Sequence, residues 1–160
     1  MNKQELIKNV EQWFIDRNLH TNDPKKQLMK LVEEFGELTD GINKNNRVEI
    51  IDAIGDMIVV MIGISLQMDI DVKPFKTPIT NDKWSNVLET INNLNYYIKN
   101  DNKIGTHSSL VQLLNLLDVI ARDYDTNAQE CLEHAYNEIK DRTGKVIDGV
   151  YVKDEPISNE

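Results

Sequence analysis

Carboxylates gather on two consecutive stretches of the chain whose other residues are mostly apolar. The stretches are KLVEEFGELTDG and EIIDAIGDMIVV, and neither acidic group is interrupted by a lysine or an arginine. The six acidic residues are Glu33, Glu34, Glu37, Glu49, Asp52 and Asp56. On a helix, spacings of three, four and seven residues bring side chains onto neighbouring parts of one face. Each stretch therefore predicts a helix that carries a cluster of negative charge beside its apolar side.

Such clusters need positive charge nearby, because like charges repel and burial of each carboxylate costs several kcal/mol. Magnesium and manganese prefer carboxylate oxygens and water, and magnesium often shares its coordination with substrate phosphates. The pattern predicts a divalent-cation site for a phosphate-bearing ligand. The alternative is a solvated acidic face, since glutamate is a good helix former.

Two helices position these carboxylates. Asp23 followed by Pro24 is a helix start signal, and the helix is expected to run to about Asn43, where GINKNN stops it. A very apolar helix is then expected from about Arg47 to Met68. A short turn joins the two, so they are expected to be antiparallel neighbours with facing carboxylates.

The rest of the chain is also mostly helical in pattern. Helices are expected from about Leu6 to Arg17, from a cap at Asn81 or Asp82 to Lys99, over 110–124, and from Thr126 or Asn127 to about Arg142. A loop marked by Pro74 and Pro78 and a turn over 99–109 separate them. The sequence predicts an all-α helical bundle forming one domain over 1–160.

The end of the chain has a different pattern. Two short β-prone runs flank Asp148-Gly149, a hairpin turn signature, so a β-hairpin tail is expected over about 144–153. Residues 155–160 are expected to be loose.

Composition restricts the partners and the compartment. The net charge of -9 over 160 residues argues against binding a nucleic acid polymer or an anionic membrane. The apolar run 50–68 contains two aspartates, so it is a better core helix than a membrane span. Cys131 is the single cysteine, and the N-terminus lacks a signal-peptide pattern. A cytoplasmic protein is expected, and so apolar a helix favours a homodimer or a homotetramer.

EEFGEL followed by EIIDAIGD resembles the signature of the MazG-like superfamily of all-α nucleoside triphosphate pyrophosphohydrolases, E-E-x-x-E, a spacer and E-x-x-D. Glu49 and Asp52 satisfy the second half. On the (E/D)-E-L-G-D pattern of many members, Asp56 takes the place of the aspartate and Ala53 stands where a glutamate is expected. Glu49, Asp52 and Asp56 all stay candidates, with Asp56 preferred. The flanking segments WFIDRNLHTNDPKKQLMKLVEE and CLEHAYNEIKDRTGKVIDGVYVK resemble members from phages and low-GC Gram-positive bacteria.

The resemblance implies hydrolysis of a nucleoside triphosphate to the monophosphate and pyrophosphate, as nucleotide-pool housekeeping. It implies that Mg²⁺, or Mn²⁺, is held by the six carboxylates and that Glu34 or Glu37 orients or deprotonates water. The related dimeric all-α dUTPases, and a non-enzymatic metal-binding helical interaction module, are the alternatives.

Cations for the polyphosphate are expected near the C-terminus. The resemblance points to Asn137 and Lys140 as nucleotide-binding residues, and Arg142 and Lys145 lie in the same segment, NEIKDRTGK. Lys30 is a further candidate. The alternative is that the C-terminal group only complements a helix C-terminus and that Lys30 forms an ordinary pair one turn before Glu34.

The sequence gives no reason to assign a catalytic or metal-binding role to the histidines or the aromatic residues. His20 and His107 fall in predicted turns, and His134 lies on a charged helix face, none with a partner at metal-ligand spacing. Trp13 and Phe14 have helical spacing and are expected in the core.

Overall fold

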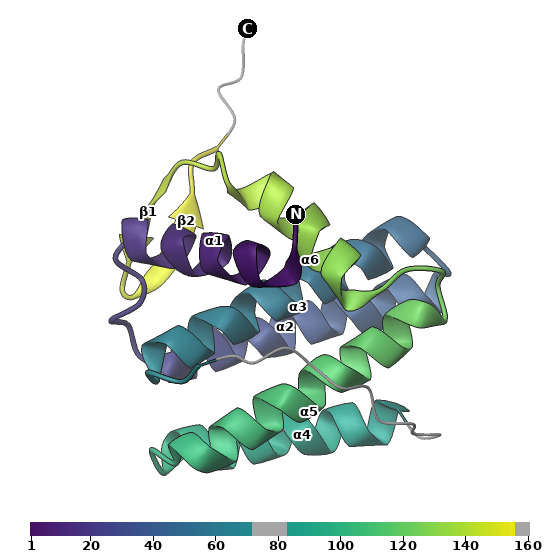
Figure 1. Cartoon of the computed structure of the whole chain (residues 1–160), viewed down its shortest axis with the longest axis horizontal. Helices are drawn as coiled ribbons and strands as arrows, with labels where there is room; N and C mark the ends of the chain where they lie inside the picture. The colour runs from purple at the N-terminus through teal and green to yellow at the C-terminus, as the bar shows by residue number, and fades with distance from the viewer. Residues whose placement is uncertain (72–82, 156–160) are drawn as a thin grey trace, which may run out of the picture.

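The computed structural model describes residues 1–71 and 83–155, and in these residues six helices precede one antiparallel β-hairpin (Figure 1). The elements are α1 (Lys3–Asp16), α2 (Pro24–Asn43), α3 (Arg47–Gln67), α4 (Lys83–Lys99), α5 (Lys103–Arg122), α6 (Ala128–Ile139), β1 (Gly144–Ile147) and β2 (Val150–Lys153). The all-α prediction with a C-terminal hairpin is confirmed. The predicted Pro74–Pro78 loop, the cap at Asn81 or Asp82, and residues 156–160 lie outside the described residues.

The two helices that carry the acidic residues form the predicted antiparallel pair. The Asp23 side chain accepts a hydrogen bond from the backbone N–H of Lys25, and Pro24 begins α2. Asn46 caps α3 in the same way, and only three residues separate the helices. Because the connection is so short, α2 and α3 must lie side by side, and they pack against each other along their length (Figure 1).

Helix α3 is the centre of the protein. It packs against α1, α2, α5 and α6, and the apolar residues from Ile50 to Ile64 are almost all buried. These neighbours belong to the same chain. The apolar composition of α3 is therefore explained by intramolecular packing and does not itself require a second copy.

Helices α4 and α5 form a second antiparallel pair that lies along one side of the bundle (Figure 1). The predicted turn over 99–109 is wrong at its C-terminal end. The side chain of Asn102 accepts a hydrogen bond from the N–H of Gly105 at 2.9 Å and starts α5 at Lys103. His107 is therefore helical.

By length and composition α5 could cross a membrane, but core helices pass the same test. Its apolar side chains, such as Leu113, Leu117 and Ile120, are buried inside the protein.

Helix α6 ends at Ile139, three residues before the predicted end at Arg142. The N–H of the Trp13 indole donates to the carbonyl of Ile139 at 2.9 Å, and the Arg17 guanidinium donates to the carbonyl of Arg142 at 2.6 Å. The side chains of Trp13, in α1, and of Arg17, which follows α1, thus satisfy carbonyl groups at and beyond the C-terminal end of α6. Trp13 and Phe14 are buried in the core, as predicted.

The hairpin begins directly after this segment. Asp148 and Gly149 both have positive φ, 51° and 78°, which a two-residue hairpin turn of this kind requires. The predicted turn is confirmed.

Candidate active site

An open cleft of about 460 Å³ lies between the acidic faces of α2 and α3. Its lining residues are Glu33, Gly36, Glu37, Asp40, Glu49 and Asp52. Four of the six predicted carboxylates therefore meet at one surface. Their convergence follows from the antiparallel pairing, which turns the acidic stripe of α3 toward that of α2.

Glu34 is not among the residues that line this cleft and is buried, with a side chain only 5% exposed. One of its oxygens, Oε1, lies 2.9 Å from Lys30 Nζ, but the other, Oε2, is covered and has no hydrogen-bond partner in the part of the chain that the structure describes. Burial raises the pKa of Glu34, the Lys30 ion pair opposes that rise, and the charges of Glu37 and Glu33 add to it. The single lysine does not fully compensate the buried carboxylate.

Asp56 lies one turn after Asp52 on α3 and is exposed to the negative charge of the neighbouring carboxylates. Burial raises the pKa of Asp56 to about 7, and the nearby carboxylates of Glu34 and Asp52 contribute to the rise. Arg142 opposes it. Within the acidic group, Glu34 is thus buried, Asp52 and Asp56 are partly buried, and Glu33, Glu37 and Glu49 are exposed.

The donor set fits a hard divalent cation. Among the described residues, Glu34 Oε2 and Asp52 Oδ1 are carboxylate oxygens that are covered yet have no hydrogen-bond partner. Buried polar atoms normally have a partner, so such orphaned acceptors indicate a missing cation or water. Carboxylate oxygens are the ligands that Mg²⁺ and Mn²⁺ prefer.

The predicted cations differ in their relation to these carboxylates. Lys30 lies 3.2 Å from Glu33 Oε1 in addition to its contact with Glu34. Burial lowers the pKa of Lys30, but its hydrogen bonds and charge attraction with these two glutamates raise it by more. Lys30 is thus engaged by the acidic group, as the ordinary-pair alternative expected.

Among the C-terminal candidates, Arg142 interacts electrostatically with one of the six carboxylates, that of Asp56. Its Nη2 lies 3.6 Å from Glu138 Oε2, and its charge lowers the pKa of Asp56. Lys140 instead donates a hydrogen bond to Asn137 Oδ1 at 3.1 Å. In the part of the chain that the structure describes, Asn137, Lys140 and Lys145 form no ion pair with the six carboxylates.

Two acidic contributions escaped the sequence analysis. Asp40 lines the cleft one turn after Glu37 and forms an ion pair with Lys44 at 2.6 Å. Its spacing from Glu37 was a usable signal. Burial is the main cause that raises the pKa of Asp52. The charge of Glu138, on α6, raises it further, whereas His134 lowers it.

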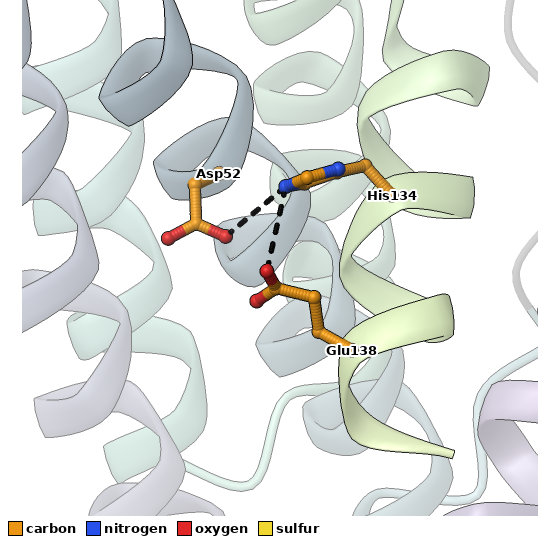
Figure 2. A group of neighbouring side chains, drawn as sticks. All are labelled: Asp52, His134 and Glu138. Carbon is orange, nitrogen blue, oxygen red and sulfur yellow. Dashed lines mark ion pairs between the residues drawn. The ribbon is translucent and has the colours of Figure 1, made fainter. Parts of the chain in front are cut away.

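The prediction that His134 has no partner at metal-ligand spacing is wrong, because it contacts Asp52 and Glu138. Figure 2 shows the side chains of Asp52, His134 and Glu138 pointing toward one another from α3 and α6. His134 and Glu138 are four residues apart on α6, a signal present in the sequence, but the contact with Asp52 depends on tertiary packing.

Gly55 makes that packing possible. A Cβ atom at this position of α3 would lie 2.2 Å from the carbonyl oxygen of Cys131 and 2.8 Å from the Cβ of Ala135 on α6. The absence of a side chain at Gly55 lets α6 lie directly against α3. This close approach brings His134 of α6 near Asp52 of α3.

Comparison with known proteins agrees with this geometry. Residues 4–81 match the phosphoribosyl-ATP pyrophosphohydrolase family, a range that includes α1, α2 and α3 and all six carboxylates. An uncharacterized 18.2 kDa protein in the rep-hol intergenic region of Haemophilus phage HP1 is 54% identical over 69 residues. That alignment covers 42% of this chain and 42% of the relative. No solved structure matches significantly.

The family match spans the helical pair that forms the acidic cleft, and the phage relative agrees with the predicted phage-type resemblance. Over residues 4–81 the chain is therefore similar to the phosphoribosyl-ATP pyrophosphohydrolase family, in agreement with the predicted resemblance to the MazG-like superfamily of all-α nucleoside triphosphate pyrophosphohydrolases.

Proposed function

We propose that the protein hydrolyses a nucleoside triphosphate, or a nucleotide of similar polyphosphate chemistry, between its α and β phosphates. The products are the monophosphate and pyrophosphate, and the reaction requires Mg²⁺ or Mn²⁺. The observation that carries the proposal is the acidic cleft between α2 and α3, together with the covered, unpartnered oxygens of Glu34 and Asp52. An acidic cleft by itself would repel a polyphosphate, so a cation must accompany the substrate.

In this proposal the carboxylates that line the cleft, those of Glu33, Glu37, Glu49 and Asp52, hold the cation. Glu34 and Asp56, which do not line the cleft, complete the acidic set. When bound, the divalent cation supplies positive charge that offsets the phosphate oxygens and makes a nearby water more acidic. The carboxylates position the substrate indirectly, because they hold the cation to which the phosphate oxygens are attracted.

Glu37 is the better candidate to accept a proton from the attacking water. It lines the open cleft and, among the described residues, has no hydrogen-bond or ion-pair partner. The alternative, Glu34, is buried, and one of its oxygens is already engaged by Lys30. A general base must reach the proton that it removes, which favours the exposed Glu37 over the buried Glu34.

Arg142 is the best placed cation for a phosphate or for the charge that develops on it. Its side chain is only partly buried, forms an ion pair with Glu138 of α6 and interacts electrostatically with Asp56, which supports this role. A guanidinium is suited to phosphate because it can donate two parallel hydrogen bonds. Asn137, Lys140 and Lys145 stay candidates for more distant parts of the nucleotide.

The test is release of pyrophosphate from a panel of substrates with Mg²⁺, with Mn²⁺ and with EDTA. The panel contains the canonical ribo- and deoxyribonucleoside triphosphates, dUTP, modified triphosphates and phosphoribosyl-ATP, the compound in the family's name. Activity restricted to dUTP would favour the dUTPase alternative. A well-folded protein without turnover on any of them would favour the metal-binding interaction module.

A homo-oligomer in the cytoplasm remains our expectation from the sequence. The exposed apolar side chains of Met29, Val32 and Leu88 flank a groove between α2 and α4, which supports self-association. Light scattering coupled to size-exclusion chromatography tests the oligomeric state.

A further inference from the structure

We propose that Asp52, His134 and Glu138 form a binding site for a transition metal ion of the Zn²⁺ class. This site shares Asp52 with the carboxylate set assigned to Mg²⁺ and adds His134 and Glu138 from α6. His134 Nε2 lies 3.6 Å from Asp52 Oδ1 and 3.7 Å from Glu138 Oε1. The three ligand atoms all lie within 4.8 Å of one another (Figure 2).

These separations are those of atoms around a common centre. A hydrogen bond between an imidazole and a carboxylate is shorter, about 2.7–3.2 Å. Ligands at about 2.1 Å from a tetrahedral zinc ion lie about 3.4 Å apart, by the bond lengths and angle of such sites. The observed 3.6 Å and 3.7 Å need only a small contraction to reach that value.

The chemistry of the donors selects the class of metal. One imidazole nitrogen with two carboxylate oxygens suits zinc, and also manganese, iron or cobalt, whereas magnesium prefers oxygen ligands alone. Three protein ligands also leave a position open for water or a substrate atom.

The ligands are held by the fold. His134 and Glu138 are one turn apart on α6, the spacing at which two helical side chains can bind one metal ion. Gly55 lets α6 approach α3 and so fixes the distance to Asp52.

Each of the three atoms is available to a metal ion. Asp52 Oδ1 is covered and has no hydrogen-bond partner within residues 1–71 and 83–155, although the rest of the side chain is accessible. Arg142 contacts the other oxygen of Glu138, Oε2, and leaves Oε1 facing His134. The side chains of Asp52, His134 and Glu138 are 38%, 41% and 44% exposed, so an ion can enter from solvent.

Asp52 also lines the acidic cleft, so the two sites meet at this shared residue. An ion held by His134 would place positive charge at the edge of the cleft, next to the proposed polyphosphate. The proposal concerns metal binding by the nucleotide-free protein and stands or falls independently of the hydrolytic activity.

The experiment is titration of the metal-free full chain with Zn²⁺ by calorimetry, followed by nitrogen NMR of ¹⁵N-histidine-labelled protein. We expect about one equivalent to bind, with a shift of the Nε2 resonance of His134 and none at His107. His134→Gln and Glu138→Gln should each weaken binding by at least about tenfold. His107→Gln, on α5, is the matched control and should bind like the natural protein.

Either of two results would overturn the proposal. One is Zn²⁺ binding that His134→Gln and Glu138→Gln leave unchanged, with no shift at His134, which would place the ion among the cleft carboxylates. The other is the absence of stoichiometric binding to the natural protein, which would leave a simple ion pair between a protonated His134 and two carboxylates. Circular dichroism verifies that the variants are folded.

Discussion

Replacement of Asp56 by asparagine should stabilise the metal-free protein at neutral and alkaline pH and leave it unchanged in acid. Burial and the charges of Glu34 and Asp52 raise the pKa of Asp56 from 3.8 to about 7. Between these two values the folded protein binds a proton that the unfolded chain has lost. Stability therefore falls as the pH rises from about 4 to about 7, and the full penalty is present above pH 7.

The size of the effect follows from the pKa. A tenfold change in proton affinity corresponds to about 1.4 kcal/mol, so the rise from 3.8 to about 7 corresponds to about 4 kcal/mol. Asp56 is only partly buried, and solvent screening reduces this to about 2 kcal/mol. Asparagine has nearly the same shape and carries no charge, so the variant should recover most of this free energy at pH 8.

The assay is urea unfolding in EDTA at pH 4, 6 and 8, with Asp141→Asn at an exposed position as the control. The free energy of unfolding of Asp56→Asn should exceed that of the natural protein increasingly from pH 4 to pH 8. Addition of Mg²⁺ should reduce the difference, because a bound cation stabilises the natural carboxylate. A difference that is the same at pH 4 and pH 8 would refute the electrostatic reasoning.

Three further predictions concern the fold. Gly55→Ala should destabilise the protein by about 2 kcal/mol in urea unfolding, because overpacking against the Cys131 carbonyl outweighs the better helix propensity of alanine. Gly36→Ala, where no atom lies within 4 Å of the new Cβ, should be neutral or stabilising by up to about 1 kcal/mol, and equal effects of the two variants would contradict the packing argument. Asn102→Ala removes the cap of α5, so it should lower the free energy of unfolding by about 1 kcal/mol and increase amide hydrogen exchange in the first turn of α5. Unchanged exchange in that turn would contradict the assignment of Asn102 as the helix cap.

Much of the fold could be predicted because its signals are local. Asp23 with Pro24 marks the start of α2, and Asp148 with Gly149 marks the hairpin turn, since each motif depends only on neighbouring residues. The missed start of α5 is of another kind. Asn102 lies in a segment rich in Asn, Asp and Gly, and such residues favour turns and helix caps alike, so composition alone predicted a longer turn.

The candidate site was accessible to the sequence only where helical spacing determines it. The spacing of Glu33 and Glu37 and the short connection to α3 were enough to expect facing carboxylates. The burial of Glu34 and the contact of His134 with Asp52 depend on how α6 packs on α3. That packing is permitted by a glycine whose role is invisible until its neighbour across the interface is known.

The central claim is that the acidic cleft is the site of pyrophosphate release. The most direct measurement compares pyrophosphate formation by the natural protein, Glu37→Gln and Glu89→Gln, on the best substrate of the panel with Mg²⁺. Glu89 is an exposed glutamate on α4, outside the cleft, and serves as the matched control. The account predicts a loss of at least about a hundredfold for Glu37→Gln, within the usual range for a general base, and no loss for Glu89→Gln. A folded Glu37→Gln variant that releases pyrophosphate at the natural rate would contradict it.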